Sequence, residues 1–144
     1  MAFASHLGSW LLGTVKNTTG TTAGTIRNMG ATVVSQANTL AYTDTSAKQM
    51  FVLPAGAQIL SFTVDATTAF NSGTNNVITI SDPSGNSLAT VTATSANITL
   101  GRATVAVTGA QIAEYVNVGS TDFIVSAVFA GTGTAATTGA ATIT

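Results

Sequence analysis

The feature that most constrains the fold of this chain is an alternation of apolar and polar residues with a period of two. The alternation is strongest in the segment TDFIVSAVFAG, whose alternate apolar residues are Phe123, Val125, Ala127 and Phe129. Successive side chains of a β-strand point to opposite faces, so this pattern predicts a strand with one buried side. Thr is abundant throughout the sequence, and its β-branched side chain suits a pleated sheet better than a helix.

The same alternation predicts further strands along the chain. In AQILSFTVDAT we expect Leu60, Phe62 and Val64 to face the core. The segment AQIAEYVNV, residues 110–118, fits either a helical turn or a strand, and its aromatic and β-branched end favours a strand. The strands expected, in chain order, are residues 31–37, 48–53, 59–65, 75–81, 88–94, 98–107 and 121–131, followed by a weakly alternating edge strand within 136–144.

Turn residues separate these runs and complete the prediction of fold class. Asp82-Pro83-Ser84-Gly85 has the composition of a type I turn, so we expect a hairpin between the strands on either side. Pro54 and Gly56 end an earlier strand. About eight or nine short strands joined by turns are typical of a sandwich. The predicted fold is therefore all-β, a jelly-roll-like β-sandwich with an extended N-terminal arm.

The arm is expected at residues 1–29 and the β-sandwich domain at residues 30–144. Residues 14–29 are rich in Thr and Gly, which disfavours both a core and a helix. Nearer the start, residues at three- and four-residue spacing are compatible with about two turns of amphipathic helix, which would need a surface to pack on. We interpret them as an interface: Phe3, Leu7, Trp10 and Leu11.

Two interpretations of Trp10 remain open: it covers an apolar patch of its own subunit, or it anchors the arm in a neighbour's pocket. The apolar start also resembles a signal peptide superficially. It lacks a basic leading region, because Lys16 is the first positive charge, and Gly8 and Gly13 interrupt it. We therefore expect no cleaved leader.

Charge is scarce in this chain, and its scarcity excludes two classes of partner. Only 6% of the 144 residues are charged, and the formal net charge is -1. Such a surface neutralises few phosphates and does not hold a protein on an anionic membrane, so we expect neither nucleic acid nor membrane as a partner. It also lacks the self-repulsion that keeps free proteins apart, which favours association.

Residues for catalysis or for cofactor and metal binding are not recognisable. Cysteine is absent and His6 is the single histidine, so a thiolate site or a His-rich metal site cannot be assembled. A hydrolase would need more than His6. The carboxylates Asp44, Asp65, Asp82, Glu114 and Asp122 are scattered along the chain, and Asp82 is explained by its turn. We expect a protein that is not an enzyme, with no cofactor and no metal.

The block QMFVLPAGAQILSFTVDATTAFNSGTNNVITISD resembles a pattern found in small virion proteins of tailed bacteriophages, particularly head decoration (cement) proteins. The matching pieces are the segments 53–57 (LPAGA), 67–71 (TTAFN), 121–124 (TDFI) and 139–143 (GAATI), so the resemblance covers most of residues 48–144. The resemblance implies a jelly-roll-like β domain that forms a homo-oligomer, often a trimer, and binds the outside of an icosahedral capsid.

From this resemblance we expect a structural virion protein on the capsid surface, whose partners are the major capsid protein and copies of itself. It would stabilise the shell through subunit contacts. Two alternatives remain: a host- or glycan-binding module displayed on the virion, and a structural component of the tail, neck or fibre base.

Overall fold

A computed structural model describes residues 33–94, 97–107 and 112–144 of the chain. The elements of the fold lie within one compact unit, Ser35–Thr144. The arm predicted at residues 1–29 lies outside the described residues, as do residues 31 and 32 of the first predicted strand.

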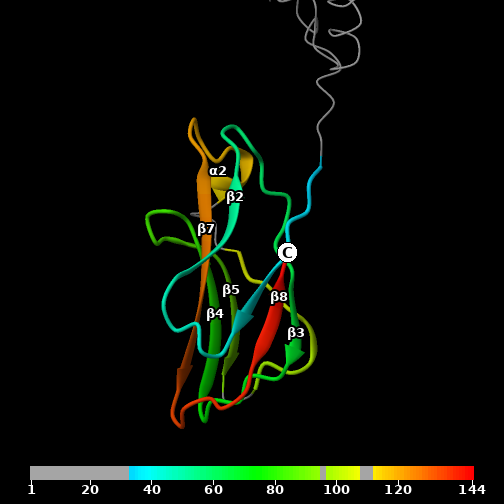
Figure 1. Cartoon of the computed structure of the whole chain (residues 1–144), viewed down its shortest axis with the longest axis vertical. Coiled ribbons are helices and arrows are strands. Elements are labelled where there is room, and N and C mark those ends of the chain that lie inside the picture. Colours follow the sequence, from blue (N-terminus) through cyan, green and yellow to red (C-terminus); the bar gives the residue numbers. More distant parts are fainter. Residues whose placement is uncertain (1–32, 95–96, 108–111) are drawn as a thin grey trace, which may run out of the picture. The chain divides into compact units, whose positions relative to one another are not determined.

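The described chain folds into two four-stranded antiparallel sheets, which confirms the predicted all-β sandwich (Figure 1). The one helix among the described residues is α2 (Ile112–Val116). The first sheet contains, in spatial order, β1 (Asn38–Ala41), β8 (Ala140–Ile143), β3 (Val64–Thr68) and β6 (Gly101–Ala103). The second sheet contains, in spatial order, β2 (Lys48–Leu53), β7 (Phe123–Thr132), β4 (Asn75–Ser81) and β5 (Ser87–Thr94).

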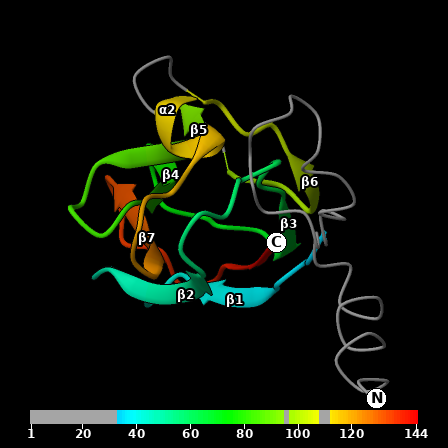
Figure 2. The same ribbon diagram turned by 90° about the horizontal axis from the view of Figure 1, so that it is seen from above.

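The strands pair in a nested order, the first with the last. β1 pairs with β8, β2 with β7, β3 with β6, and β4 with β5, all antiparallel. The chain therefore passes from one sheet to the other at every connection except the β4–β5 hairpin. Viewed from above, β7 and β4 lie on the opposite side of the sandwich from β3 and β6 (Figure 2).

The inward faces of both sheets build one apolar core. Phe70 lies within it, and its ring is 4.7 Å from the ring of Phe129, centroid to centroid. The predicted inward set of Phe123, Val125, Ala127 and Phe129 is buried, as expected. The residues with the largest fully buried side chains are Phe70, Leu40, Ile78, Ile80, Leu88, Ile143, Val64, Val125 and Asn76.

The hairpin predicted at Asp82 to Gly85 is confirmed. The Gly85 N–H donates to the Asp82 carbonyl at 3.1 Å, and Gly85 has φ of 87°, a left-handed conformation that glycine adopts without strain. The Asp82 carboxylate accepts a further bond from the Ser84 N–H at 2.8 Å. The strands predicted at 48–53 and 75–81 have the predicted bounds.

The first strand does not lie where the sequence pattern placed it. Residues 33–37 are not in a strand, and β1 begins at Asn38. Val33 and Val34, which suggested a buried strand, are 73% and 70% exposed. Leu40 supplies the buried anchor instead, because it is the residue that faces the core where β1 pairs with β8.

The strand predicted at 59–65 is shorter than expected, since β3 begins at Val64. Leu60 is 71% exposed and Phe62 is half-buried, so only Val64 of the predicted inward set is fully buried. The reason is a competing backbone contact: the Ile59 N–H donates to the Tyr115 carbonyl at 3.0 Å. Residues 56–59 thus bond to the α2 region, and the chain rejoins the sheet at Thr63, which exchanges two backbone hydrogen bonds with Thr144.

Two later expectations also need correction. Of the strand predicted at 98–107, only β6 forms a strand, although Ala106 makes an isolated bridge with Thr90 of β5. The strand favoured for the end of 110–118 is wrong, because Ile112–Val116 is the helix α2. The short helix has no buried residues, so the apolar residues of this segment did not indicate a buried strand.

The C-terminal strand is not an edge strand, contrary to the prediction. β8 lies between β1 and β3, and Ala141 and Ile143 are fully buried. Its weak alternation reflects small residues that let neighbouring segments approach closely. Gly139, immediately before β8, has φ of 149°, and a Cβ there would overlap the ring of Phe70.

Candidate interaction surfaces

The residues predicted to form an interface, Phe3, Leu7, Trp10 and Leu11, lie outside the described residues, and so does His6. The surfaces that the structure does describe are the two outer sheet faces, the strand edges and the ends of the sandwich. Sequence reasoning assigned no interface role to any of them.

The outer face of the second sheet carries no charged side chain, and we call it the uncharged face. Val52 of β2 pairs directly with Ile124 of β7, and these two side chains are 41% and 40% exposed. In the middle of the sheet Val77 pairs with Ala130. The other outward positions of the four strands that are not buried are Gln49, Asn75, Thr79, Thr90, Thr92, Thr94, Ser126, Val128 and Thr132.

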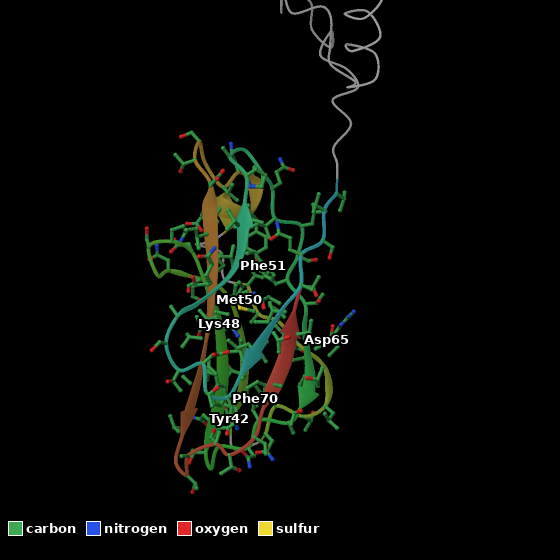
Figure 3. The ribbon with its side chains drawn as sticks, viewed as in Figure 1. Tyr42, Lys48, Met50, Phe51, Asp65 and Phe70 are labelled. Carbon is green, nitrogen blue, oxygen red and sulfur yellow. The ribbon has the colours of Figure 1, made fainter. Side chains whose placement is uncertain are left out.

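The outer face of the first sheet is different, and we call it the ion-pair face. Arg102 of β6 lies opposite Asp65 of β3 and donates two hydrogen bonds to its carboxylate, at 2.9 and 3.0 Å. The hydrogen bond from Arg102 lowers the pKa of Asp65 below its ordinary value. Figure 3 shows Asp65 on the β3 flank of the sandwich. The remaining outward residues of the strands are small and polar or Ala: Thr39, Ala41, Thr67, Ala140 and Thr142.

Side chains cap the free edge of β1. The Thr39 N–H donates to Asn38 Oδ1 at 2.8 Å, and the Ala41 N–H donates to Asp44 Oδ2 at 2.9 Å. The Thr39 carbonyl accepts a bond from Lys48 Nζ at 2.7 Å. An exposed strand edge is a template for pairing with another chain, and polar and charged side chains placed on it prevent that pairing.

The edge of β2 that faces β1 is capped in the same way. The Met50 carbonyl accepts a bond from Asn38 Nδ2 at 3.2 Å, and the Val52 carbonyl accepts one from Gln36 Nε2 at 3.1 Å. Two strand edges are therefore closed against each other by side-chain amides, which disfavours association by edge-to-edge strand addition on this side.

Asp44 and Lys48 together explain the electrostatics of this edge. The hydrogen bond from the Ala41 backbone lowers the pKa of Asp44; burial opposes this shift, and the hydrogen bond and charge of Lys48 add to it. The two charges are 3.0 Å apart. Both charged groups thus form hydrogen bonds with the backbone of β1 and with each other.

Two carboxyl groups that are far apart in the sequence meet near the β4–β5 turn. Burial raises the pKa of Glu114, and the charge of Asp82 and its hydrogen bond with Glu114 raise it further. At Asp82 burial acts to raise the pKa, but hydrogen bonds from Asn86, Ser84 and Glu114 outweigh it and the pKa is lowered. The two carboxyl groups are therefore coupled, and Glu114 holds its proton to higher pH than Asp82 does.

Geometry supports a structural role for this carboxyl pair. Asp82 Oδ1 accepts bonds from the backbone N–H groups of Ser84 and Asn86, and Oδ2 accepts one from Asn86 Nδ2. Glu114 Oε2 is buried without a hydrogen-bond partner. The hydrogen bond between Glu114 and Asp82 links α2 to the turn that Asp82 also stabilises. Sequence reasoning explained Asp82 by its turn and missed Glu114, which only the fold brings near it.

No group of three or more His, Cys, Asp and Glu residues in residues 33–94, 97–107 and 112–144 is arranged to hold a metal ion. Over the same ranges, no helix has the length and apolar character needed to cross a membrane. Every aromatic side chain in those ranges is buried or half-buried.

The sequence matches no family model, and the searches of curated proteins and of solved structures found no significant relative. The surfaces described above are therefore interpreted from their own chemistry. The uncharged face could have been read from the sequence by asking which residues fill the outward positions of the predicted strands, in addition to the inward ones.

Proposed function

We propose that this chain is a structural virion protein that decorates the outer surface of a capsid and stabilises the shell through contacts with the major capsid protein and with its own copies. The proposal is supported by the resemblance of residues 48–144 to phage decoration proteins and by the surface of the sandwich. The single observation that carries it is a broad outer sheet face without charge, bordered on its β2 side by a capped strand edge.

The strand order supports a jelly-roll-like interpretation of the sandwich. In the nested pairing β1 with β8, β2 with β7, β3 with β6 and β4 with β5, one long folded hairpin wraps into two sheets. Double-sheet jelly rolls of eight strands occur in viral capsid proteins and also in lectins. The topology is therefore compatible with the leading hypothesis and with the glycan-binding alternative, and it does not distinguish them.

The physical mechanism is burial of weakly polar surface at many repeated contacts. Apolar area removed from water contributes about 25 cal/mol per Å², and a specific interface needs more than about 1,000 Å² in total. A surface of Val, Ala, Thr and Ser loses little hydration energy on burial because it has no charges to desolvate. Many copies on one shell then add their contributions.

The placement of the described charges is compatible with a structural role. Six of the charged residues take part in capping, pairing or turn formation, which leaves them few groups for chemistry. They are Asp44, Lys48, Asp65, Arg102, Asp82 and Glu114.

A host- or glycan-binding function is less well supported. Sugar sites commonly present an exposed aromatic ring for the sugar to stack on. Of the aromatic residues in the described ranges, Tyr42, Phe62 and Tyr115 are half-buried and the others are buried. Tyr115 is further occupied by an edge-to-face contact with Phe62, with ring centroids 5.9 Å apart.

The test is to find the protein on a particle and then to remove it. Particles assembled with and without this chain are compared by cryo-electron microscopy, and their survival is measured on heating and in low salt. We expect density for the sandwich on the outside of the head and earlier rupture of particles that lack it. Density on the tail or neck, or equal survival of both particles, would contradict the decoration role.

A further inference from the structure

We propose that the uncharged face is a two-fold contact through which two copies of this chain pair, sheet against sheet. This inference rests on the proposed function as an assembly protein and specifies which surface and which partner provide one of its contacts. The partner is a second copy presenting the same face.

The chemistry of the face suits contact with itself. In a two-fold interface the same patch is present on both sides, so every charged residue on it would meet or approach its own copy. The uncharged face has none, and like-charge repulsion is therefore absent. Its apolar residues include two separate pairs, Val77 beside Ala130 and Val52 beside Ile124. Val128 and Ser126 occupy the outward positions of β7 between these pairs.

The size of the face is sufficient for a specific contact. Four strands at a spacing of about 4.8 Å give a width of about 19 Å, and the seven residues of β4 extend about 23 Å. With the longer β7 alongside, the flat footprint is about 500 Å² on each copy, or about 1,000 Å² in total. That reaches the lower bound for a biological interface before the relief of the side chains is added.

The ion-pair face and the β1 and β2 edges are less suited to self-pairing. On the ion-pair face Arg102 is exposed over 70% of its side chain, and burial of that face would remove a charged pair from water at a cost. The β1 and β2 edges are capped by Asn38, Asp44 and Lys48. Two small-residue sheets can approach to the spacing of about 10 Å seen in sandwiches.

The test measures self-association of the full chain by sedimentation velocity over a range of concentrations. Val128 lies on the uncharged face, half-buried in the central strand β7. Val128→Lys places two like charges in the contact and should raise the dissociation constant at least tenfold. The matched control is Thr142→Lys, at an outward, half-buried position of the central strand β8 on the opposite face, and it should leave pairing unchanged.

Cross-linking gives a second measurement, which does not require the fold to tolerate a lysine at this face. The chain contains no cysteine, so one introduced thiol reports a single position. Ala130→Cys, exposed on the uncharged face, should form a covalent dimer with a short bis-maleimide, whereas Thr39→Cys, exposed on the ion-pair face, should not. Circular dichroism of each variant verifies that the sandwich has folded.

The outcomes separate this inference from the proposed function. Dimers or even multiples that Val128→Lys dissociates support it. A wild-type chain that stays monomeric at its highest soluble concentration, or forms only trimers, overturns the two-fold contact even where the protein is found on the capsid. Loss of pairing in Trp10→Ala but not in Val128→Lys would assign the contact to the N-terminal segment. Equal loss in Val128→Lys and Thr142→Lys would also overturn the two-fold contact through the uncharged face.

Discussion

The two sheets of the sandwich resemble each other on their inner faces and differ on their outer faces. Inward, each contributes fully buried aliphatic residues, such as Ile78 from the second sheet and Ile143 from the first. Outward, the second sheet is without charge, whereas the first carries the Asp65–Arg102 pair. The inner faces must be alike because both fill one apolar core. The outer faces have no such constraint, so their residues can differ to suit interaction with other molecules.

The difference shows where this chain uses its few charges. Asp44 and Lys48 cap the β1 edge, Asp82 and Glu114 join a turn to a helix, and one more pair lies on one outer face. Among the described residues, these charges therefore lie at a strand edge, at a turn and on one outer sheet face, and the outward strand positions of the second sheet carry none. Natural sheet proteins use edge charges in this protective way.

The largest expected effects come from truncating a buried side chain on the inner face of either sheet. Ile78→Ala and Ile143→Ala each remove a fully buried side chain and should each lower the free energy of unfolding by about 2–5 kcal/mol. Urea denaturation followed by circular dichroism measures both. Thr142→Ala, the outward neighbour of Ile143, is the control and should have little effect. A large loss for one isoleucine and none for the other would show that the two sheets do not share one core.

A smaller effect is expected at the capped edge. Asp44→Ala leaves the Ala41 N–H without its acceptor and should lower the free energy of unfolding by about 1–2 kcal/mol at pH 7. Because the pKa of Asp44 is lowered in the folded state, its contribution is present above the unfolded pKa and is lost as pH falls through the folded pKa. Thermal melts from neutral to acidic pH should show a gap between wild type and variant that closes in acid.

The control for the edge is Thr45→Ala, which changes the next, exposed residue and leaves the cap intact. Light scattering provides a further measurement, since uncapping should also promote aggregation through the strand edge. A gap that widens in acid would contradict the assignment of Asp44 as a capping carboxylate.

Changing Glu114 of the carboxyl pair should alter the free energy of unfolding by about 1 kcal/mol or less. Its pH dependence should be opposite to that of Asp44. The pKa of Glu114 is raised in the folded state, so its contribution is present below the unfolded pKa and is lost as pH rises through the folded pKa. Glu114→Gln keeps the shape without the charge and should be more stable than wild type at neutral pH but not in acid. Asp122→Asn, a carboxylate exposed before β7, serves as control. A Glu114→Gln variant less stable than wild type at neutral pH would contradict the raised pKa of Glu114.

The smallest effect is expected from the exposed ion pair. Arg102→Gln should barely change the melting temperature, because an exposed pair gains little over two hydrated charges. The remaining difference should vanish when salt is added. By contrast, self-association through the uncharged face should respond little to moderate salt. Association that weakens strongly with salt would indicate that the ion-pair face takes part in the contact.

Several elements could be predicted from the sequence because their signals are local. The hairpin at Asp82 and the strand at Phe123 follow from turn chemistry and from alternation within a few residues. The position of β8 could not be predicted, since its small residues alternate weakly and its central place depends on β1 and β3. The proximity of Glu114 to Asp82 was equally hidden, because 31 intervening residues separate them in the sequence.

The sequence by itself determined that this chain forms an all-β sandwich with little charge and with inward stripes of apolar residues. Alternation, β-branched composition and turn residues act over short distances, so they can be recognised from neighbouring residues in the sequence. Only the tertiary structure decided which strands become neighbours, which edges are capped and which outer face stays uncharged. Those properties depend on pairing between residues far apart in the chain, and the free energy that selects the pairing comes from the shared core.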